Sequence, residues 1–205
     1  MATDSSAGPV VYAPAVKLGP VSTFDRWVDE RFAAHLRDIP AADRVFYAAS
    51  ALGDHGLVWL MLAAVRGLRS DTSELHPTVR AMGAVGIESI LVNGPIKWVF
   101  RRQRPPPGAG SHLPLRQPRT SSFPSGHATS AFCAATLLSD GDPALRPLYY
   151  GLAVIVAWSR IHVRVHYASD VIGGAVIGVA LGQIIKRLVP LPPTTPGESP
   201  SQPAG

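Results

Sequence analysis

The sequence has little charge and almost no cysteine, and both shortages narrow the class of protein. Charged residues make up 16% of the chain, whereas an ordinary soluble domain carries about a quarter. Because Cys133 is the single cysteine, no intramolecular disulfide can form, and the redox compartment is left open. Hydrophobic residues make up 46% and the mean hydropathy is +0.16, so we expect membrane-spanning segments in this chain of 205 residues.

The first residues of the sequence do not have the pattern of a cleavable signal peptide. Residues 1–20 have no basic start followed by an apolar core, so we expect the first membrane helix to direct insertion in place of a cleavable signal peptide. Small residues, Pro and Gly dominate residues 1–21, and Pro, Thr, Ser and Gly dominate residues 190–205. These compositions predict an irregular N-terminal segment and a disordered C-terminal tail around one membrane-embedded domain, residues 22–189.

Five apolar stretches predict an all-α fold, a polytopic transmembrane helix bundle with about five spans. The stretches are residues 45–67, 79–100, 125–138, 145–161 and 171–189. A span needs roughly 20 residues, so the third stretch is long enough only if Pro124 and the residues before it begin the helix. Helices are expected because an isolated strand cannot satisfy its backbone in lipid.

An N-terminal amphipathic helix is predicted over residues 22–39. Ser22 and Asp25 resemble a capping box at its start. The sequence leaves two interpretations open, a short packing helix or an interfacial helix with its aromatic face among lipid headgroups. The apolar residues that recur at helical spacing are Phe24, Trp27, Val28, Phe32 and Leu36.

Polar and small residues inside the apolar stretches predict contacts between helices. Asp54, His55 and Glu88 lie within the first two stretches. Because a buried charge in a span is costly, we favour a structural pair between helices over a direct catalytic role. The last stretch carries glycines at four-residue spacing, Gly174, Gly178 and Gly182. Such a ridge favours close packing inside the bundle over dimerisation.

Two short clusters at the ends of these stretches have features of a phosphate site. Lys97 is followed after six residues by Arg104 and Pro105, although basic residues commonly flank membrane helices. Residues 124–127 are Pro-Ser-Gly-His, a helix start whose free amides and positive dipole end attract an anion. His127 would stand beside that anion, and the alternative is a plain helix start with an incidental histidine.

A third cluster combines a cation, a histidine and a carboxylate. Ser159 and Arg160 are followed after five residues by His166, and after three more by Asp170. The guanidinium of Arg160 suits phosphate oxygens. A carboxylate bonded to one ring nitrogen of His166 fixes the tautomer and leaves the other nitrogen free to attack. The alternative is that Asp170 only caps the last helix.

The expected topology brings all three clusters to one membrane face. The second and fourth helices end at Lys97 and Arg160, and the third and fifth begin at Ser125 and Asp170. When neighbouring helices are antiparallel, these four ends lie on the same side. We therefore expect two histidines, one aspartate and three cations to converge there.

Together and in this order, the clusters resemble the signature of the type 2 phosphatidic acid phosphatase superfamily. That signature is Lys-x6-Arg-Pro, Pro-Ser-Gly-His and Ser-Arg-x5-His-x3-Asp, and the chain matches every position. The resemblance implies an integral-membrane, metal-independent lipid phosphatase, a hydrolase of phosphoric esters or diphosphates without a cofactor. The expected active face also shows no cluster of Asp, Glu and His typical of a divalent-metal site.

The resemblance further implies a role for each signature residue. His166 would be the nucleophile that forms a phosphohistidine, and Asp170 would orient it. His127 would protonate the leaving group and then activate water. The residues implied to hold the phosphate oxygens are Lys97, Arg104, Ser125, Gly126 and Arg160.

Several further polar residues near this face are interpreted as solvated loop residues. Contact with the substrate headgroup or with membrane lipid is the alternative for each of them. They are Arg101, Arg102, His112, Arg116, Arg119, His162 and Arg164.

Other functions share such an anion pocket. A soluble acid phosphatase would not need the nearly uncharged stretch 171–189, and a compact membrane core disfavours a vanadate-dependent haloperoxidase. A catalytically silent membrane protein that binds anionic lipid needs cations, but no nucleophile with an orienting partner. The net charge of +5 and the pI of about 9.8 suit lipid phosphates and membrane lipids. No nucleic-acid partner is expected, because the basic residues flank apolar stretches.

Substrate, orientation and oligomeric state are left open by the sequence. The resemblance implies a polyprenyl phosphate or diphosphate, a polyprenyl-linked sugar phosphate, phosphatidic acid or phosphatidylglycerol phosphate. A composition rich in Ala, Gly, Pro, Val and Arg is compatible with a high-GC bacterium, which favours a polyprenyl carrier of cell-wall synthesis. We expect a multi-pass plasma-membrane protein with its site on the non-cytoplasmic face. The basic residues of 22–44 oppose that orientation.

Overall fold

The structure, a computed structural model, describes residues 19–53, 56–69, 75–106, 118 and 120–192. Across these residues the chain is helical and contains no strand. The predicted all-α class is therefore confirmed for the described part of the chain. Most of the residues expected to form the N-terminal segment and the C-terminal tail lie outside it.

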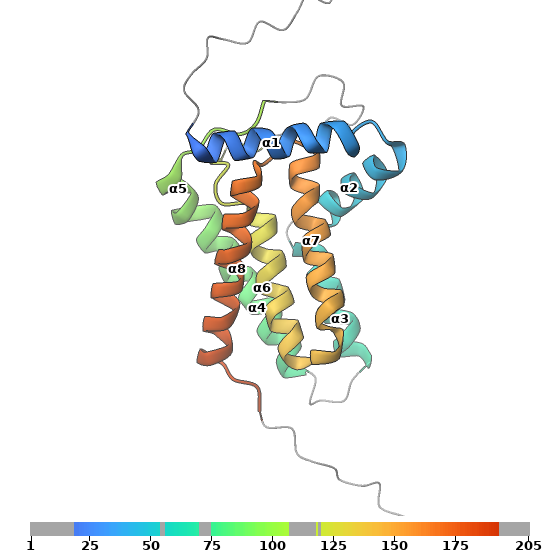
Figure 1. Cartoon of the computed structure of the whole chain (residues 1–205). Coiled ribbons are helices and arrows are strands. Elements are labelled where there is room, and N and C mark those ends of the chain that lie inside the picture. The colour runs from blue at the N-terminus through green and yellow to red at the C-terminus, as the bar shows by residue number, and fades with distance from the viewer. Residues whose placement is uncertain (1–18, 54–55, 70–74, 107–117, 119, 193–205) are drawn as a thin grey trace, which may run out of the picture.

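Four long helices run side by side, and a fifth lies across one end of them. Figure 1 shows α4, α6, α7 and α8 along the long axis of the molecule, with α1 across their upper end. A π-helical turn (Val92–Ile96) joins α4 to α5, and a 3₁₀ turn (Pro143–Leu145) joins α6 to α7. In chain order the α-helices are α1 (Pro20–His35), α2 (Pro40–Leu52), α3 (Leu57–Arg69), α4 (Leu75–Leu91), α5 (Lys97–Phe100), α6 (Gly126–Gly141), α7 (Arg146–His162) and α8 (Ala168–Leu188).

The central helix α6 packs against α4, α7 and α8, and glycines of α8 set the closest of these contacts. A Cβ atom on Gly178 would lie 2.3 Å from the carbonyl oxygen of Thr129. One on Gly174 would lie 2.6 Å from the carbonyl oxygen of Ser125. Only glycine permits such an approach, so the predicted packing role of this ridge is confirmed.

Helix α1 begins at Pro20, and its start is not the predicted capping box. Gly19 occupies the N-cap position without a side-chain hydrogen bond, and Asp25 is buried, with 3% of its surface exposed. Phe32 packs against a core cluster of α6, α7 and α8, whereas Trp27 remains exposed. The aromatic face of α1 is thus divided, because Phe32 packs against the bundle and Trp27 faces outward.

The membrane spans are less continuous than the apolar stretches. Among the described residues, α8 is the one helix with the length and apolarity to cross a membrane. The stretch 45–67 is divided between α2 and α3, close to Gly56, whose φ is +70°. The stretch 79–100 bends at the π-helical turn, where Gly94 has non-helical dihedral angles and Pro95 follows. Five spans therefore stay a prediction.

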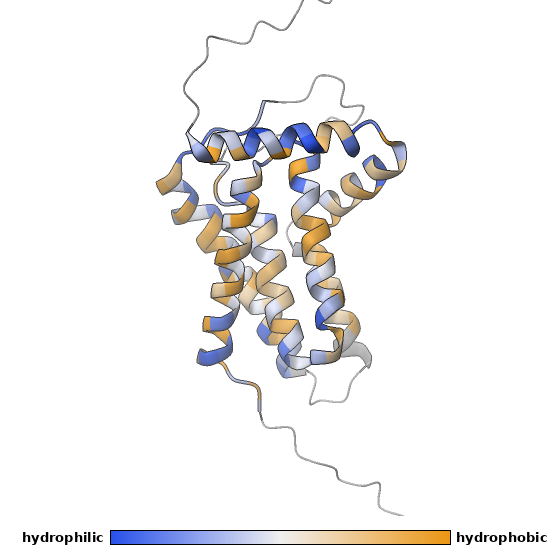
Figure 2. Cartoon of the chain, in the orientation of Figure 1, coloured by the Kyte–Doolittle hydropathy of each residue, from blue (hydrophilic) through white to orange (hydrophobic). Residues whose placement is uncertain are grey.

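Large apolar side chains cover much of the outer surface. Figure 2 shows hydrophobic residues along α4, α5 and α8, whereas hydrophilic residues concentrate on α1. Ile90, Trp98 and Val176 are 73%, 72% and 64% exposed. Soluble monomers rarely expose large contiguous apolar patches, so this surface supports a bundle that faces lipid.

Candidate active site

The three motif clusters meet at the end of the bundle that α1 covers. A cavity of about 390 Å³ is lined there by six of the eight predicted site residues, Lys97, Arg104, Gly126, His127, Arg160 and His166. The other two, Ser125 and Asp170, are fully buried and contact each other. The backbone N–H of Ser125 donates to the carbonyl oxygen of Asp170 over 3.1 Å, which joins the start of α6 to the start of α8.

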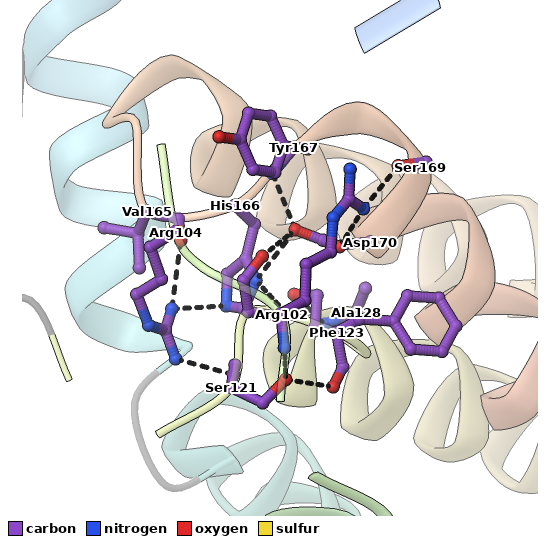
Figure 3. A network of polar contacts seen from close by, with 12 residues as sticks. Arg102, Arg104, Ser121, Phe123, Ala128, Val165, His166, Tyr167, Ser169 and Asp170 are labelled. Atoms are coloured by element: carbon purple, nitrogen blue, oxygen red, sulfur yellow. Dashed lines mark hydrogen bonds and ion pairs between the residues drawn. The ribbon is translucent and has the colours of Figure 1, made fainter. Parts of the chain in front are cut away.

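His166 lies in the loop between α7 and α8, and each of its ring nitrogens has a specific partner. Nδ1 lies 2.7 Å from the carbonyl oxygen of Ser122, so Nδ1 carries the proton and donates it. Nε2 lies 3.2 Å from Nη1 of Arg104. Because a guanidinium can only donate, the partners assign an unprotonated Nε2. The lone pair of the ring therefore faces Arg104, and Figure 3 shows the contact between Arg104 and the ring of His166.

The surroundings of His166 keep its imidazole neutral. The residue is 3% exposed. Burial lowers its pKa, and the positive charges of Arg104 and Arg160 lower it further, while Asp170 acts in the opposite direction. A neutral imidazole with an unprotonated nitrogen is what a nucleophilic histidine requires, and in this structure that nitrogen accepts a hydrogen bond from Arg104.

Asp170 fastens the start of α8 to the loop that carries His166. Its Oδ2 accepts a hydrogen bond from the backbone N–H of Tyr167 over 2.9 Å and completes a capping box. The same oxygen accepts from the hydroxyl of Ser122 and lies 3.8 Å from Nδ1 of His166. The direct partner of that nitrogen is thus the Ser122 carbonyl. Asp170 caps α8 and also positions the residue that holds the imidazole.

Backbone carbonyl groups fix the guanidinium of Arg104 beside His166. Nη1 donates to the carbonyl oxygen of Val165 over 2.9 Å. Nε and Nη2 donate to the carbonyl oxygens of Thr120 and Ser121, each over 3.1 Å. Because neutral acceptors hold it, Arg104 keeps its full positive charge for an anion in the cavity.

Two further cations are placed by residues of the cavity wall. Nζ of Lys97 donates to Oδ1 of Asn93 over 2.9 Å, and Arg160 donates to the hydroxyl of Ser50. A Cβ on Gly126 would lie 3.1 Å from Oδ1 of Asn93 and 3.7 Å from Nζ of Lys97. The small residue at position 126 therefore lets the lysine reach the start of α6.

The start of α6 carries the two remaining predicted site residues, Ser125 and His127. Ser125 is its N-cap, and Oγ of Ser125 accepts from the backbone N–H of Ala128 over 3.5 Å. Its contact with phosphate stays a prediction. His127 faces the cavity, and a Cβ on Gly53 would lie 2.8 Å from its ring. The end of α2 therefore packs against His127, and glycine at position 53 makes room for it.

Arg102 supports the site in a way that the sequence interpretation missed. Its Nη1 donates to Oδ1 of Asp170 over 2.5 Å, and its Nη2 donates to Oδ2 of Asp25 over 2.7 Å. The assignment to solvated loop residues is wrong for Arg102 and also for His162 and Arg164, which pair with carboxylates of α2 and α1. Arg101 lies over the ring of Trp98, 5.4 Å from its centroid. The residues of that set outside the described part of the chain are His112, Arg116 and Arg119.

Glu88 forms a contact between helices, as predicted, but with α6. Its carboxylate accepts from the hydroxyl of Ser130 over 2.5 Å. Ser130 also lines the cavity. The other two groups considered for this pairing, Asp54 and His55, lie outside the described residues.

Known sequences and structures resemble the chain over most of this helical core. The family model described as the PAP2 superfamily matches residues 78–192. Decaprenylphosphoryl-5-phosphoribose phosphatase of Mycobacterium tuberculosis is 37% identical over 66% of this chain and 74% of that protein. Undecaprenyl-diphosphatase BcrC of Bacillus subtilis is 29% identical over 62% of this chain and 65% of that protein.

Two solved structures have a similar fold. The first transmembrane PAP2 type phosphatidylglycerolphosphate phosphatase from Bacillus subtilis superposes with a TM-score of 0.62 at 26% identity, covering 84% of this chain and 87% of that one. Aquifex aeolicus LpxE superposes with a TM-score of 0.61 at 25% identity, covering 83% and 97%. The helical arrangement in Figure 1 is thus shared with a transmembrane phosphatase and with LpxE.

Proposed function

Because the chain belongs to the PAP2 superfamily and its named relatives are phosphatases, we propose that it removes a phosphate from a membrane lipid through a phosphohistidine on His166. One observation carries the proposal. The unprotonated Nε2 of His166 adjoins a cavity lined by three fixed cations, while the proton on Nδ1 is held by the Ser122 carbonyl.

The first half of the reaction transfers the phosphoryl group to the protein. Lys97, Arg104 and Arg160 bind the phosphate oxygens and neutralise their charge, which is the main requirement of phosphoryl transfer. Nε2 of His166 attacks phosphorus as the bond to the lipid oxygen breaks. His127 gives a proton to that oxygen, so the lipid leaves as an alcohol or a lipid monophosphate.

The second half restores the protein. His127, now neutral, takes a proton from a water molecule, and the resulting hydroxide attacks the phosphohistidine. The phosphorus–nitrogen bond breaks, inorganic phosphate leaves, and Nε2 regains its lone pair. Throughout, the Ser122 carbonyl and Asp170 stabilise the positive charge that the phosphorylated ring carries.

The proposed substrate is a polyprenyl-linked phosphate in which a polar group, a sugar or a second phosphate, lies between the lipid chain and the terminal phosphate that is removed. A second hollow of about 950 Å³ adjoins the cavity and shares Asn93, Lys97 and Arg104 with it. Trp98 and Arg101 line the outer part of that hollow. This leaves room for a bulky headgroup beside the phosphate, and exposed apolar residues of α5 lie next to it for the lipid chain.

We also propose that the protein is a multi-pass protein of the plasma membrane with the site on its non-cytoplasmic face. The outward-facing apolar residues and the transmembrane phosphatase of similar fold support the membrane location. The proposed face rests on the resemblance described above and is tested below.

The test is phosphate release by the purified protein in detergent with EDTA present. The panel contains a polyprenyl diphosphate, a polyprenyl-linked sugar phosphate, phosphatidic acid and phosphatidylglycerol phosphate. We expect release by wild type, fastest with a polyprenyl substrate, and none by His166→Ala. His76→Ala, which changes an exposed histidine, is the matched control and keeps full activity.

Three results would count against the proposal. Release that persists in His166→Ala would remove His166 as the nucleophile. Loss of release with EDTA would indicate a metal-dependent reaction. Binding of anionic lipid by both proteins, without release by either, would favour a catalytically silent lipid-binding protein.

A further inference from the structure

A buried chain of charged groups links helix α1 to the nucleophile. Asp25 of α1 is 3% exposed and accepts a hydrogen bond from Nη2 of Arg102 over 2.7 Å. Nη1 of the same guanidinium donates to Oδ1 of Asp170 over 2.5 Å. Oδ2 of Asp170 in turn accepts from the hydroxyl of Ser122, whose carbonyl holds Nδ1 of His166. Figure 3 shows the inner part of this chain, from Arg102 to His166.

Ser169 fastens the outer part of the chain to the first turn of α8. Its backbone N–H donates to Oδ1 of Asp25, and its hydroxyl donates to Oδ2, both over 2.8 Å. Nη1 of Arg102 lies 2.7 Å from the same hydroxyl. The guanidinium also lies over the ring of Tyr167, 4.5 Å from its centroid. Hydrogen bonds from both terminal nitrogens and the stacking of Tyr167 on one face therefore fix the guanidinium of Arg102.

We propose that Asp25 and Arg102 are positioning residues of the phosphatase reaction, which fix the carboxylate of Asp170 and, through Ser122, the imidazole of His166. This inference rests on the proposed function. Neither residue lines the cavity of about 390 Å³ in which His166 meets the three cations. Arg102 lines the adjoining hollow of about 950 Å³, and Asp25 and Arg102 line a third hollow of about 410 Å³ that reaches the outer side of His166. The hydrogen bonds link Arg102 to Asp170, and Asp25 to Arg102, so we assign both residues an action through Asp170.

The charges explain why two carboxylates and one cation are needed. Asp25 and Asp170 share the single positive charge of Arg102, so one net negative charge stays behind His166. That charge stabilises the imidazole ring when phosphorylation makes it positive. Without Asp25, the charge of Arg102 would neutralise that of Asp170, and no net negative charge would remain to stabilise the imidazole ring. Without Arg102, two buried carboxylates would repel each other and Asp170 would move or take up a proton.

Simple attachment of α1 to the bundle does not require this chain, because α1 has a second anchor. Asp29 pairs with Arg37 over 2.5 Å and with Arg164 over 3.1 Å. Arg37 also donates to the carbonyl oxygens of Ile161 and His162 at the end of α7. Asp29→Asn therefore serves as a matched control, since it removes a carboxylate from the same helix but not from the chain to His166.

The kinetic test compares Asp25→Asn, Arg102→Gln, the double variant and Asp29→Asn. Loss of the partner that orients a metal-ligating histidine typically costs roughly 10–100-fold, and we take the same scale for the reactive His166. We expect that loss in kcat for each single variant, with KM changed by less than about threefold. Because Asp25 acts through Arg102, the double variant should lose no more than the worse single variant. Asp29→Asn should keep wild-type kcat.

A binding test separates this inference from the choice of lipid substrate. Orthovanadate forms a bond to a histidine nitrogen, whereas inorganic phosphate only occupies the anion site. We expect Asp25→Asn and Arg102→Gln to weaken orthovanadate binding about tenfold and phosphate binding by much less. Ser169→Ala changes no charge, and we expect it to weaken orthovanadate binding to a smaller degree. It keeps the test decisive if a variant that changes a charge does not fold.

The outcomes are distinct. Wild type that binds orthovanadate but releases no phosphate from any lipid contradicts the proposed function, and the variants still decide the role of Asp25 and Arg102. Equal weakening of orthovanadate and phosphate overturns the inference, because it indicates general loosening of the site. The inference is also overturned if Asp29→Asn loses as much kcat as Asp25→Asn does.

Discussion

His166 is the residue at which burial and charge decide the protonation state. Three groups act on its pKa beyond burial itself. Arg104 and Arg160 lower the pKa, and Asp170 raises it, with a net shift below the ordinary value of 6.5. The folded protein thus keeps the ring neutral at pH values where the unfolded chain already binds a proton.

This difference predicts that stability falls as the pH drops below about 6.5. Above that pH the ring is neutral in both states and contributes no pH dependence. Below it the unfolded chain gains a proton that the folded protein excludes, so the free energy of unfolding decreases, at most by about 1.4 kcal/mol per pH unit. Thermal unfolding in detergent at pH values from about 5 to about 7, around the imidazole pKa, measures this decrease in the free energy of unfolding. The decline should be shallower in His166→Gln and unchanged in His76→Gln.

At the same scale, the sequence identified the residues that line the cavity better than the residues that support them. Lys97, Arg104 and His166 are recognisable because their chemistry and spacing are local. Ser122 and Asp25 are not, because each acts through a contact between segments far apart in the sequence. Asn93 did leave a signal, since it stands one helical turn before Lys97. The proposed chemical roles of all these residues stay predictions.

At the scale of the helix, α6, α7 and α8 end close to the predicted positions, whereas the earlier helices do not. The later boundaries have local causes, such as the Ser125 cap and Pro147 in the first turn of α7. The break between α2 and α3 and the bend at Gly94 occur inside apolar stretches, where hydropathy continues across them. The supposed capping box of α1 failed because Asp25 has a stronger partner in Arg102.

The contact between α6 and α8 predicts a position-specific effect of added methyl groups. Gly178→Ala would place a Cβ 2.3 Å from the Thr129 carbonyl oxygen, and we expect a loss of about 1–3 kcal/mol or more from overpacking. Gly151→Ala on α7 has open space around it and is the control. It should leave stability unchanged or raise it, since alanine favours a helix. Thermal unfolding in detergent compares the two variants. Equal midpoints would show that α6 and α8 accommodate the added methyl group without loss of stability.

At the scale of the whole molecule, the two ends of the bundle have different electrostatic arrangements. At the end covered by α1, three cations line one cavity, an arrangement suited to an anion. Elsewhere, Arg80 and Lys186 both pair with Asp140, over 2.7 Å and 2.9 Å. The pairing with one carboxylate gives these two cations a structural role in addition to any effect on membrane orientation.

The orientation is testable because the single cysteine is inaccessible. Cys133 is fully buried, so a membrane-impermeant maleimide should not label wild type. We expect Arg26→Cys, on exposed α1, to be labelled in intact cells, and Arg187→Cys, at the end of α8, only after permeabilisation. The reverse pattern would put the site in the cytoplasm. Labelling of both variants in intact cells would contradict the proposed arrangement of spans.

The glycine ridge of α8 has a mechanical consequence. Since its glycines bring the backbone of α8 against that of α6, few side chains lie between the two helices that could rearrange. The hydrogen bond from Ser125 to Asp170 closes the same seam at its upper end. We therefore expect the start of α6 and the loop that carries His166 to move as one rigid piece. When the surrounding bilayer thins, thickens or changes its lateral pressure, we expect the outer helices to tilt while the distance between His166 and the start of α6 is preserved.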